Sequence, residues 1–361
     1  MKKRKKILSA ALAAMVAVSM FSFVGCGKEQ GETGNQGGTG NKGGTEKAEE
    51  LKLGLGVAST YGKSTSADGE TNGSTEVDAT VAAVLLDKDG KIVKCVIDVA
   101  QNKALYGADG KGIANEDFKT KGELGADYGM AAHGTDRNGD GVVKEWNEQR
   151  DGFVSCVEGK TIDEVKALVV EGYGNDDVVA AGCTIAISDF VAAVEKAVAN
   201  AAASKATADD TLQLGIVTTQ SVKDATEEKE GSNELDTAIT AAVVGKDGKV
   251  VVAFTDMLQA KITFDTAGAC TTDTAKELKT KKELGADYGM AAHGTDKNGD
   301  GVVKEWDEQA AAFDAALAGL DAAGISALES EGYGVESVQK AGCTIAISDM
   351  VKAAVKAATV K

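Results

Sequence analysis

One nine-residue string occurs twice in this 361-residue chain and constrains the fold more than any other feature. Ala-Gly-Cys-Thr-Ile-Ala-Ile-Ser-Asp occupies residues 181–189 and again residues 341–349, and each copy follows a Glu-Gly-Tyr-Gly string. Each copy also leads into a stretch rich in alanine and valine. Because such repetition indicates that one structural unit is used more than once, the sequence predicts two copies of one domain. We place them at residues 49–206 and 207–361.

The first 48 residues have the composition of a leader and a tether. A basic run at residues 2–6 precedes an apolar stretch at residues 7–24, and Phe-Val-Gly-Cys ends at Cys26. This order predicts a lipoprotein signal peptide over residues 1–25 and a lipid on the thiol of Cys26; an ordinary signal peptide is the alternative. Residues 26–48 are polar and glycine-rich, which predicts a flexible linker. We therefore expect a location outside the cytoplasm, anchored to the cell membrane.

The charge of the chain limits its partners. The formal net charge is −17, and removal of the five basic residues at positions 2–6 leaves −22. Such a chain is poorly matched to nucleic acid or to an anionic lipid surface, so we expect no nucleic-acid partner and membrane attachment through the lipid alone. The five cysteines after Cys26 lack the spacing of a disulfide framework, and most are expected to be small buried residues.

The periodicity of each copy predicts strands first and helices later. Extended runs at residues 75–86 and 92–99, and at 235–244 and 250–254, flank Lys-Asp-Gly-Lys turns and predict β-hairpins. First strands are expected at residues 51–59 and 211–219, and polar loops at 61–73 and 221–232. Helices are expected over residues 143–157 and 303–317, with closing helices N-capped by Ser188 and Ser348. The fold class predicted is α+β, with two tandem homologous repeats, each a small antiparallel sheet followed by several helices.

Three strings recur in the same order in both copies: Thr-Lys-x-Glu-Leu-Gly-Ala-Asp-Tyr-Gly-Met, then Lys-Glu-Trp-x-Glu-Gln, then Gly-Cys-Thr-Ile-Ala-Ile-Ser-Asp. On these strings the chain resembles the paired FMN-binding lipoproteins of Gram-positive extracellular electron transfer. The resemblance implies FMN joined through its phosphate to a threonine by a separate flavin transferase. It also implies that the flavins relay electrons from a membrane redox donor to an extracellular acceptor.

Matched residue by residue, the resemblance assigns the flavin anchors to Thr184 and Thr344. Gly182 and Gly342 match the glycine of the transferase target, whereas Cys183 and Cys343 stand where an alanine is usual. Glycine beside the anchor lets backbone approach backbone closely, and a threonine hydroxyl needs activation by an outside catalyst. The alternative is a buried strand, Cys-Thr-Ile-Ala-Ile, that leads into a capped helix.

A second pair of strings matches a calcium-binding loop, with Asp, Asn and Asp at positions one, three and five and Gly at position six. The candidate ligands in the first copy are Asp136, Asn138, Asp140, the carbonyl of Val142, and Asn147. Those in the second copy are Asp296, Asn298, Asp300, the carbonyl of Val302, and Asp307. Position twelve normally holds a bidentate glutamate, so Asp307 suits calcium better than Asn147. The alternative is an Asn-Gly or Asp-Gly turn that leads into a tryptophan-bearing helix.

These patterns favour an electron carrier over a self-contained enzyme, since the chain holds no Walker loop, dinucleotide fingerprint or catalytic triad pattern. The predicted function is a lipid-anchored extracytoplasmic flavoprotein with FMN on a threonine in each repeat. The alternative is a calcium-stabilised surface binding or adhesion module without a redox cofactor.

Overall fold

The computed structural model describes residues 49–294, 299 and 301–359. The predicted signal peptide, Cys26 and the predicted linker lie outside these residues. All described residues belong to one unit by their contacts, Lys47–Lys361. We call residues 49–206 the first half and the described residues from 207 onward the second half.

The first half contains three long antiparallel strands. They are β1 (Lys52–Thr65), β2 (Gly73–Leu86) and β3 (Ile92–Tyr106). The pairing registers are Lys52 opposite Leu86 and Gly73 opposite Tyr106. Two short strands, β4 (Gly112–Ile113) and β7 (Ala202–Ala203), extend the sheet to the order β4-β3-β2-β1-β7.

Short helices and turns follow the sheet of the first half. They are α1 (Lys121–Leu124), η1 (Gly125–Tyr128), α2 (Met130–His133), α3 (Trp146–Val157), α4 (Ile162–Lys166), α5 (Asp176–Ala180) and α6 (Ser188–Ala199). A two-stranded ribbon of β5 (Val169–Val170) and β6 (Tyr173–Gly174) lies between α4 and α5.

The described residues of the second half follow the same element order, except that β4 and β7 have no counterpart among them. Its sheet has the order β10-β9-β8 and consists of β8 (Thr211–Lys223), β9 (Gly231–Val244) and β10 (Val250–Phe264). Its helices and turns are α7 (Lys281–Leu284), η2 (Gly285–Tyr288), α8 (Met290–His293), α9 (Trp306–Leu317), α10 (Ala322–Ser326), α11 (Glu336–Lys340) and α12 (Ser348–Ala358). A ribbon of β11 (Glu329–Ser330) and β12 (Tyr333–Gly334) precedes α11.

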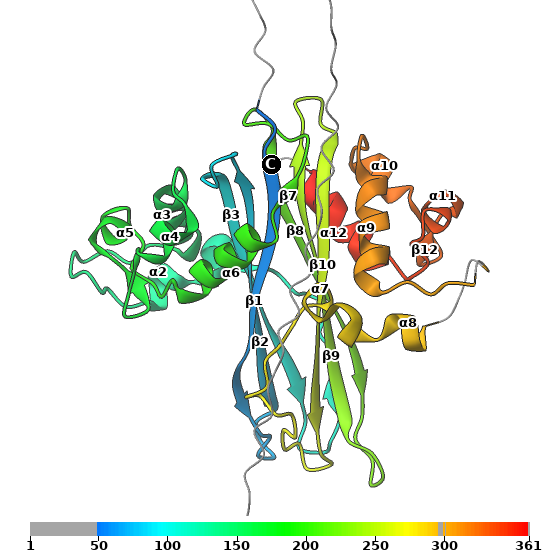
Figure 1. Ribbon diagram of the computed structural model, residues 1–361. Coiled ribbons are helices and arrows are strands. Elements are labelled where there is room, and N and C mark those ends of the chain that lie inside the picture. Colours follow the sequence, from blue (N-terminus) through cyan, green and yellow to red (C-terminus); the bar gives the residue numbers. More distant parts are fainter. Residues whose placement is uncertain (1–48, 295–298, 300, 360–361) are drawn as a thin grey trace, which may run out of the picture. The chain divides into compact units, whose positions relative to one another are not determined.

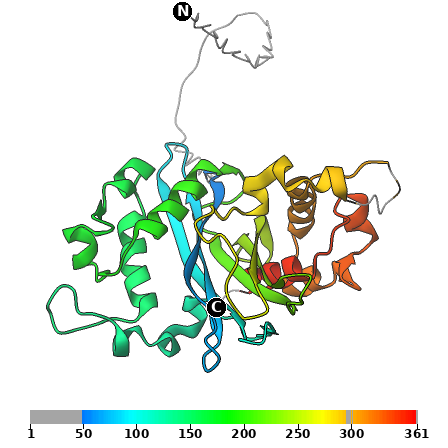
Figure 2. The same cartoon turned by 90° about the horizontal axis from the view of Figure 1, so that it is seen from below.

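The two sheets lie face to face and share one apolar core. Leu53, Leu85 and Tyr106 of the first sheet belong to the same buried cluster as Ile239 and Phe264 of the second. Helices cover the opposite face of each sheet, as Figures 1 and 2 show, and form a separate core with it in each half. The order of layers in this unit is therefore helices, sheet, sheet, helices.

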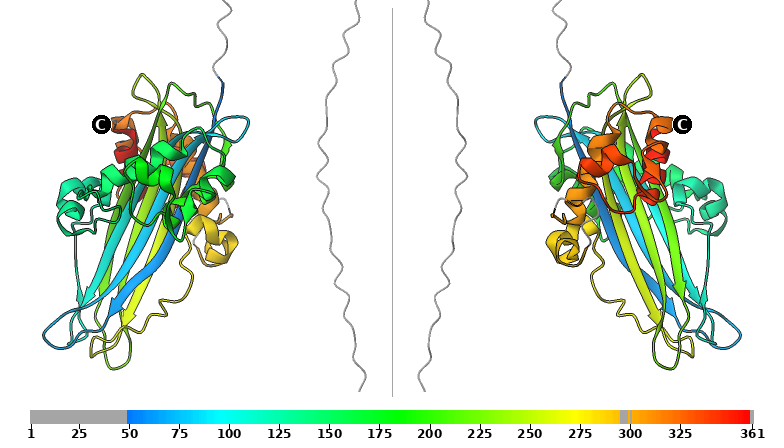
Figure 3. Two further views of the ribbon diagram at one scale, coloured as in Figure 1. Left: turned by 90° about the vertical axis from the view of Figure 1, so that its left-hand side faces the viewer. Right: turned by 90° about the vertical axis from the view of Figure 1, so that its right-hand side faces the viewer.

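The burial of β2 follows from these layers. Its first residues alternate between buried and half-buried positions, whereas every residue from Ala79 to Leu86 is buried. The alternating end extends beyond the helices (Figure 3), so only one of its faces is covered. Where helices and the second sheet enclose the strand, both faces are apolar.

One glycine in each half lets a helix lie close to a strand. A Cβ atom at Gly56 would lie 2.2 Å from the carbonyl oxygen of Ala193 on α6, and one at Gly215 would lie 1.9 Å from that of Ala353 on α12. Only glycine fits at these two positions, because any side chain would collide with the backbone of the helix.

Several sequence expectations are corrected in detail. The polar loops predicted at residues 61–73 and 221–232 are shorter, because β1 continues to Thr65 and β8 to Lys223. The predicted N-caps Ser188 and Ser348 are wrong: both are first residues of their helices, and Ile187 and Ile347 hold the cap positions. The amide of Ile187 donates to the carbonyl of Gly172, so the preceding turn fixes where the helix begins.

The mixed α+β class and the antiparallel sheets are confirmed. The helix predicted to begin at residue 143 begins instead at Trp146, where Glu145 provides a capping box with Glu148. None of the five cysteines in the described residues forms a disulfide. Cys95, Cys183 and Cys343 are buried, as predicted, whereas Cys156 and Cys270 are half-buried.

One buried carboxylate occurs only in the second half. Asp314 on α9 is 8 % exposed and accepts a hydrogen bond of 3.0 Å from the amide of Thr255, while Lys282 Nζ lies 3.6 Å away. Burial raises the pKa of Asp314 to about 6 despite the attraction of Lys282. The corresponding position in the first half is Val154, which carries no charge.

Candidate functional site

The two predicted anchor threonines lie in a short irregular segment between α5 and α6, and between α11 and α12. Both side chains are half-buried. Gly182 and Gly342 precede them with φ values of +95° and +104°, a region that side chains rarely adopt. The backbone therefore turns sharply immediately before the Cys-Thr pair.

A buried glutamine holds each threonine in place. Gln149 on α3 is 2 % exposed, and its Oε1 accepts from the amide of Thr184 at 2.9 Å and from the hydroxyl of Thr184 at 3.0 Å. Its Nε2 donates to the carbonyl of Lys144 at 3.0 Å and contacts the sulfur of Met130 at 3.3 Å. The glutamine is thus held in place itself and fixes the side-chain orientation of the threonine.

The second half repeats this arrangement with nearly equal distances. Gln309 Oε1 accepts from the amide of Thr344 at 2.8 Å and from its hydroxyl at 3.1 Å, and Gln309 Nε2 donates to the carbonyl of Lys304 at 3.0 Å. Sequence reasoning missed both glutamines as site residues. The repeated Lys-Glu-Trp-x-Glu-Gln string was the available signal, because it ends on them.

An ammonium group lies beside the glycine that precedes each Cys-Thr pair. A Cβ atom added to Gly182 would lie 2.0 Å from Lys144 Nζ, and one added to Gly342 would lie 2.2 Å from Lys304 Nζ. Each lysine side chain therefore occupies the space that a side chain at the glycine would fill. In the first half Lys144 and Thr184 line one cavity, so this positive charge suits a phosphate group on the threonine hydroxyl.

Cavities open directly at both threonines. In the first half a cavity of about 260 Å³ is lined by Thr184, Gly182, Gln149, Lys144 and Asp140, among others. In the second half Thr344 lines two cavities. One of about 780 Å³ faces β12 and α11, and the other of about 300 Å³ faces α7, α8 and α9. Neither threonine is sealed inside the protein.

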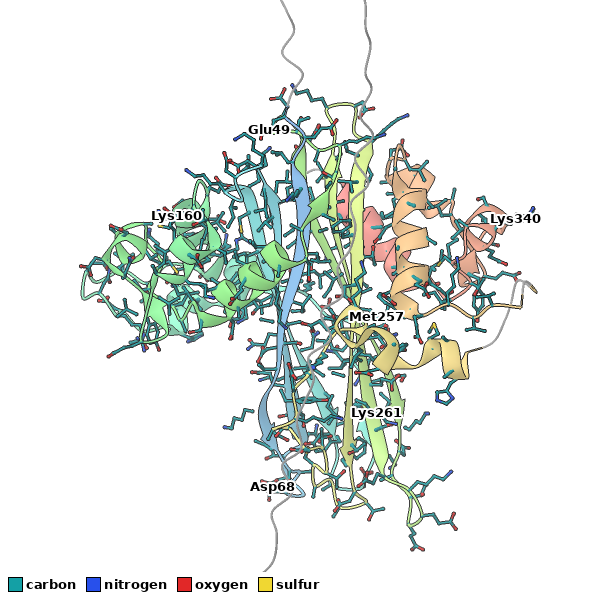
Figure 4. The ribbon with its side chains drawn as sticks, viewed as in Figure 1. Glu49, Asp68, Lys160, Met257, Lys261 and Lys340 are labelled. Carbon is teal, nitrogen blue, oxygen red and sulfur yellow. The ribbon has the colours of Figure 1, made fainter. Side chains whose placement is uncertain are left out.

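The 300 Å³ cavity has apolar and aromatic walls with one buried lysine. Met257, Met290 and Trp306 line it together with Lys281, which is only 7 % exposed. Met257 is labelled in Figure 4 on β10, close to α7. Lys281 Nζ lies 5.6 Å from the centre of the Trp306 ring and 5.0 Å from that of Tyr288. An apolar pocket of this size with few polar groups suits a small aromatic ligand.

The first half has the same lysine and aromatic rings. Lys121 Nζ lies 5.0 Å from the centre of the Tyr128 ring and 6.0 Å from that of Trp146. These distances are in the range of a cation–π interaction, which helps to hold the ammonium in place.

Carboxylates on the second strand of each sheet interact electrostatically with these lysines. Burial and, to a smaller extent, the charge of Glu76 raise the pKa of Asp78 to about 6, while Lys121 opposes both effects. Burial also raises the pKa of Asp236, and Lys281 opposes it. Gln259 Nε2 donates to Asp236 at 2.9 Å and to Glu234 at 3.2 Å, so the pair in the second half is hydrogen-bonded.

The structure places the two cysteines next to the threonines away from the cavities. Cys183 and Cys343 are fully buried in the helix–sheet cores, and neither lines a cavity described above. Burial raises the pKa of each thiol to about 11. They pack as small apolar residues in the place of the alanine that the resemblance leads one to expect.

The calcium-loop candidates of the first half form an exposed curl. Asp136 accepts from the amides of Gly139 and Gly141 at 2.8 and 2.9 Å, and Asn138 donates to Asp140 at 2.8 Å. Val142 is 59 % exposed, and Asn147 lies in the first turn of α3. Within the residues that the structure describes, no three His, Cys, Asp or Glu side chains gather as a metal-binding group.

In the second half, Asp296, Asn298 and Asp300 lie outside the described residues, so only Val302 and Asp307 are placed. Asp307 is on the first turn of α9. Asn138, Asp140 and Val142 line the same cavity as Thr184, which brings the two candidate sites of the first half together. The sequence did not predict this proximity.

Comparison of the chain with protein-family models, characterised proteins and solved structures gave no match. Over residues 49–294, 299 and 301–359, no helix combines the length and the apolar character needed to span a bilayer.

Proposed function

We propose that the chain is a lipid-anchored extracytoplasmic flavoprotein that carries FMN on Thr184 and Thr344 and relays electrons at the cell surface. One observation carries this proposal. In each half a half-buried threonine lines a cavity, a buried glutamine accepts a hydrogen bond from its hydroxyl, and a lysine ammonium lies beside the glycine two residues before it. The resemblance to FMN-binding lipoproteins supplies the identity of the group.

The residues around Thr344 fit a phosphate-linked ring. Lys304 would neutralise the phosphate, and the apolar 300 Å³ cavity with Trp306 and Lys281 would receive the ring. Esterification removes the hydrogen bond that the Thr344 hydroxyl donates to Gln309 Oε1, but the amide of Thr344 still donates to the same oxygen. The glutamine therefore keeps a partner, and the buried network survives the modification.

A bound isoalloxazine would supply the redox chemistry, since it accepts and releases electrons. The protein would position the ring, exclude water from it and adjust its potential. In the second half Lys281, in the wall of the 300 Å³ cavity, would place a positive charge near the ring, which favours the more negatively charged, reduced form.

The remainder of the proposal concerns organisation and partners. We infer that the two halves are tandem homologous repeats, because their strings and element orders correspond. The partners would be a flavin transferase, a membrane redox donor and an extracellular electron acceptor. A lipid on Cys26 would hold the protein at the membrane.

The test is coexpression with a flavin transferase of the FMN-attaching type, followed by intact-protein mass spectrometry. Two FMN-sized increments and a yellow protein are expected. Thr184→Ala and Thr344→Ala should each remove one increment, whereas Thr→Ser at the same positions keeps a hydroxyl and serves as the matched control. An unmodified mass in the parent protein would refute the proposal.

A calcium-stabilised surface binding module is the second candidate. The curl around Asp136 and its hydrogen bonds from two glycine amides favour it, because oxygen ligands in a calcium loop are arranged around such a curl. A visible absorption spectrum separates the two candidates, since only the flavoprotein is coloured.

A further inference from the structure

Two ion pairs cross between the halves in a matching way. Lys196 Nζ on α6 of the first half lies 2.5 Å from Glu283 Oε1 on α7 of the second half. Lys356 Nζ on α12 of the second half lies 2.6 Å from Glu123 Oε1 on α1 of the first half. The members of both pairs are partly shielded from solvent.

Each lysine also bonds to the first strand of its own half. Lys196 Nζ donates to the carbonyl of Val57 on β1 at 2.9 Å, and Lys356 Nζ donates to the carbonyl of Ile216 on β8 at 2.6 Å. Because each ammonium binds a carboxylate and a backbone carbonyl at once, the lysine side chain cannot move freely into solvent. Each pair therefore ties a strand of one half to a turn of the other.

The glutamates that receive these lysines also hold the turn together. Glu283 Oε2 accepts from the amide of Thr280 at 2.9 Å, and the hydroxyl of Thr280 accepts from the amide of Glu283 at 3.2 Å. One carboxylate oxygen thus closes the capping box while the other takes Lys196. Glu123 and Thr120 form the same box in the first half.

The residue after each capping threonine is a lysine that lies over aromatic rings. Lys281 follows Thr280 and lies over Trp306 in the wall of the Thr344 cavity. Lys121 follows Thr120 and lies over Tyr128 and Trp146. A helix from the other half therefore stabilises the turn that positions each lysine.

We propose that Lys196 and Lys356 are positioning residues, each of which sets the geometry of the lysine–tryptophan pair in the opposite half. Lys196 acts on Lys281 and Trp306 through Glu283, and Lys356 acts on Lys121 and Trp146 through Glu123. Neither lysine acts on its own half in this way. What the cavity binds rests on the proposed function, but the geometric coupling does not depend on a flavin.

The chain provides a built-in reporter for this coupling, because its two tryptophans lie one in each half. Incorporation of 5-fluorotryptophan into the full chain without flavin gives two ¹⁹F resonances, which Trp146→Phe assigns. We expect Lys196→Met to shift the Trp306 resonance and leave that of Trp146 in place. Lys356→Met should do the reverse. Lys196→Arg and Lys356→Arg keep the charge and should largely restore each resonance.

Lys166→Met is the matched control. Lys166 pairs with Glu195 at 2.6 Å, but both residues lie in the first half, so its removal should leave the Trp306 resonance unchanged. Circular dichroism verifies that every variant is folded. The inference is overturned if the resonance of the same half moves, if both move equally, or if neither moves. A correct crossed pattern without FMN attachment would refute only the proposed function, and attachment without the pattern would refute only this inference.

Discussion

Replacement of Gln149 by leucine tests whether one side chain holds the threonine in place. The substitution removes the acceptor shared by the amide and hydroxyl of Thr184 and the donor to the carbonyl of Lys144. Each of these three hydrogen bonds contributes about 1 kcal/mol, and the added apolar burial of leucine offsets about 1 kcal/mol. We expect the free energy of unfolding to fall by about 2 kcal/mol.

Urea unfolding monitored by tryptophan emission measures this loss. Thr184→Val removes only the hydroxyl bond and should cost about 1 kcal/mol, because the amide still donates to Gln149. The double variant should cost less than the sum of the two single variants, since the hydroxyl bond is counted in both. Gln309→Leu and Thr344→Val repeat the experiment in the second half. A loss of less than about 0.5 kcal/mol for Gln149→Leu would refute the assignment, because substitutions on a plain surface have effects of that size.

Three further perturbations test other features. Gly182→Ala should cost about 1–3 kcal/mol through backbone strain at φ +95° and should lower flavin attachment, because the new Cβ displaces Lys144 Nζ. Gly159→Ala, with φ +81° and no atom within 4 Å of the added Cβ, should cost a similar amount but leave attachment unchanged; an equal loss of attachment in both variants would contradict the steric argument. Because the folded pKa of Asp314 is about 6, above its ordinary value of 3.8, stability should fall as pH rises between these two values. Asp314→Asn should remove this pH dependence in urea unfolding and raise the free energy of unfolding at pH 8 by about 1–3 kcal/mol. An unchanged pH dependence in the variant would contradict the assignment to Asp314. Calcium should release heat in a titration and raise the melting temperature, and both effects should be smaller in Asp140→Asn. If the parent protein shows no heat and no rise in melting temperature, the calcium prediction is wrong.

The hairpins were predictable because their signals are local. Lys-Asp-Gly-Lys turns between alternating apolar runs specify the β2–β3 and β9–β10 connections, and both hairpins form. The ends of the strands were not predictable in the same way. Asn102 on β3 is buried, and its side-chain Nδ2 donates to the hydroxyl of Thr218 in the other sheet at 3.0 Å, so its partner is distant in the sequence. A polar residue with such a partner resembles a loop residue when it is viewed alone.

The candidate site divides along the same line. The repeated Gly-Cys-Thr string located the two threonines, because identity between two distant segments is visible in the sequence itself. The contact of Gln149 and Lys144 with that segment depends on how α3 packs against it, and no local pattern encodes this packing. The predicted cap at Ser188 failed for a related reason. Its hydroxyl donates to the carbonyl of Gly172, in a turn where Glu171 has a φ of +51°.

The shared core between the two sheets makes the chain comparable to a dimer joined by a covalent tether. If residues 49–206 and 207–361 were produced as separate polypeptides, each would expose the sheet face that now holds Leu53 and Tyr106, or Ile239 and Phe264. Tethering keeps the effective concentration of one face for the other in the millimolar range at any dilution. The two faces of such a protein stay paired even when few copies are present, whereas two independent subunits would have to find each other by diffusion.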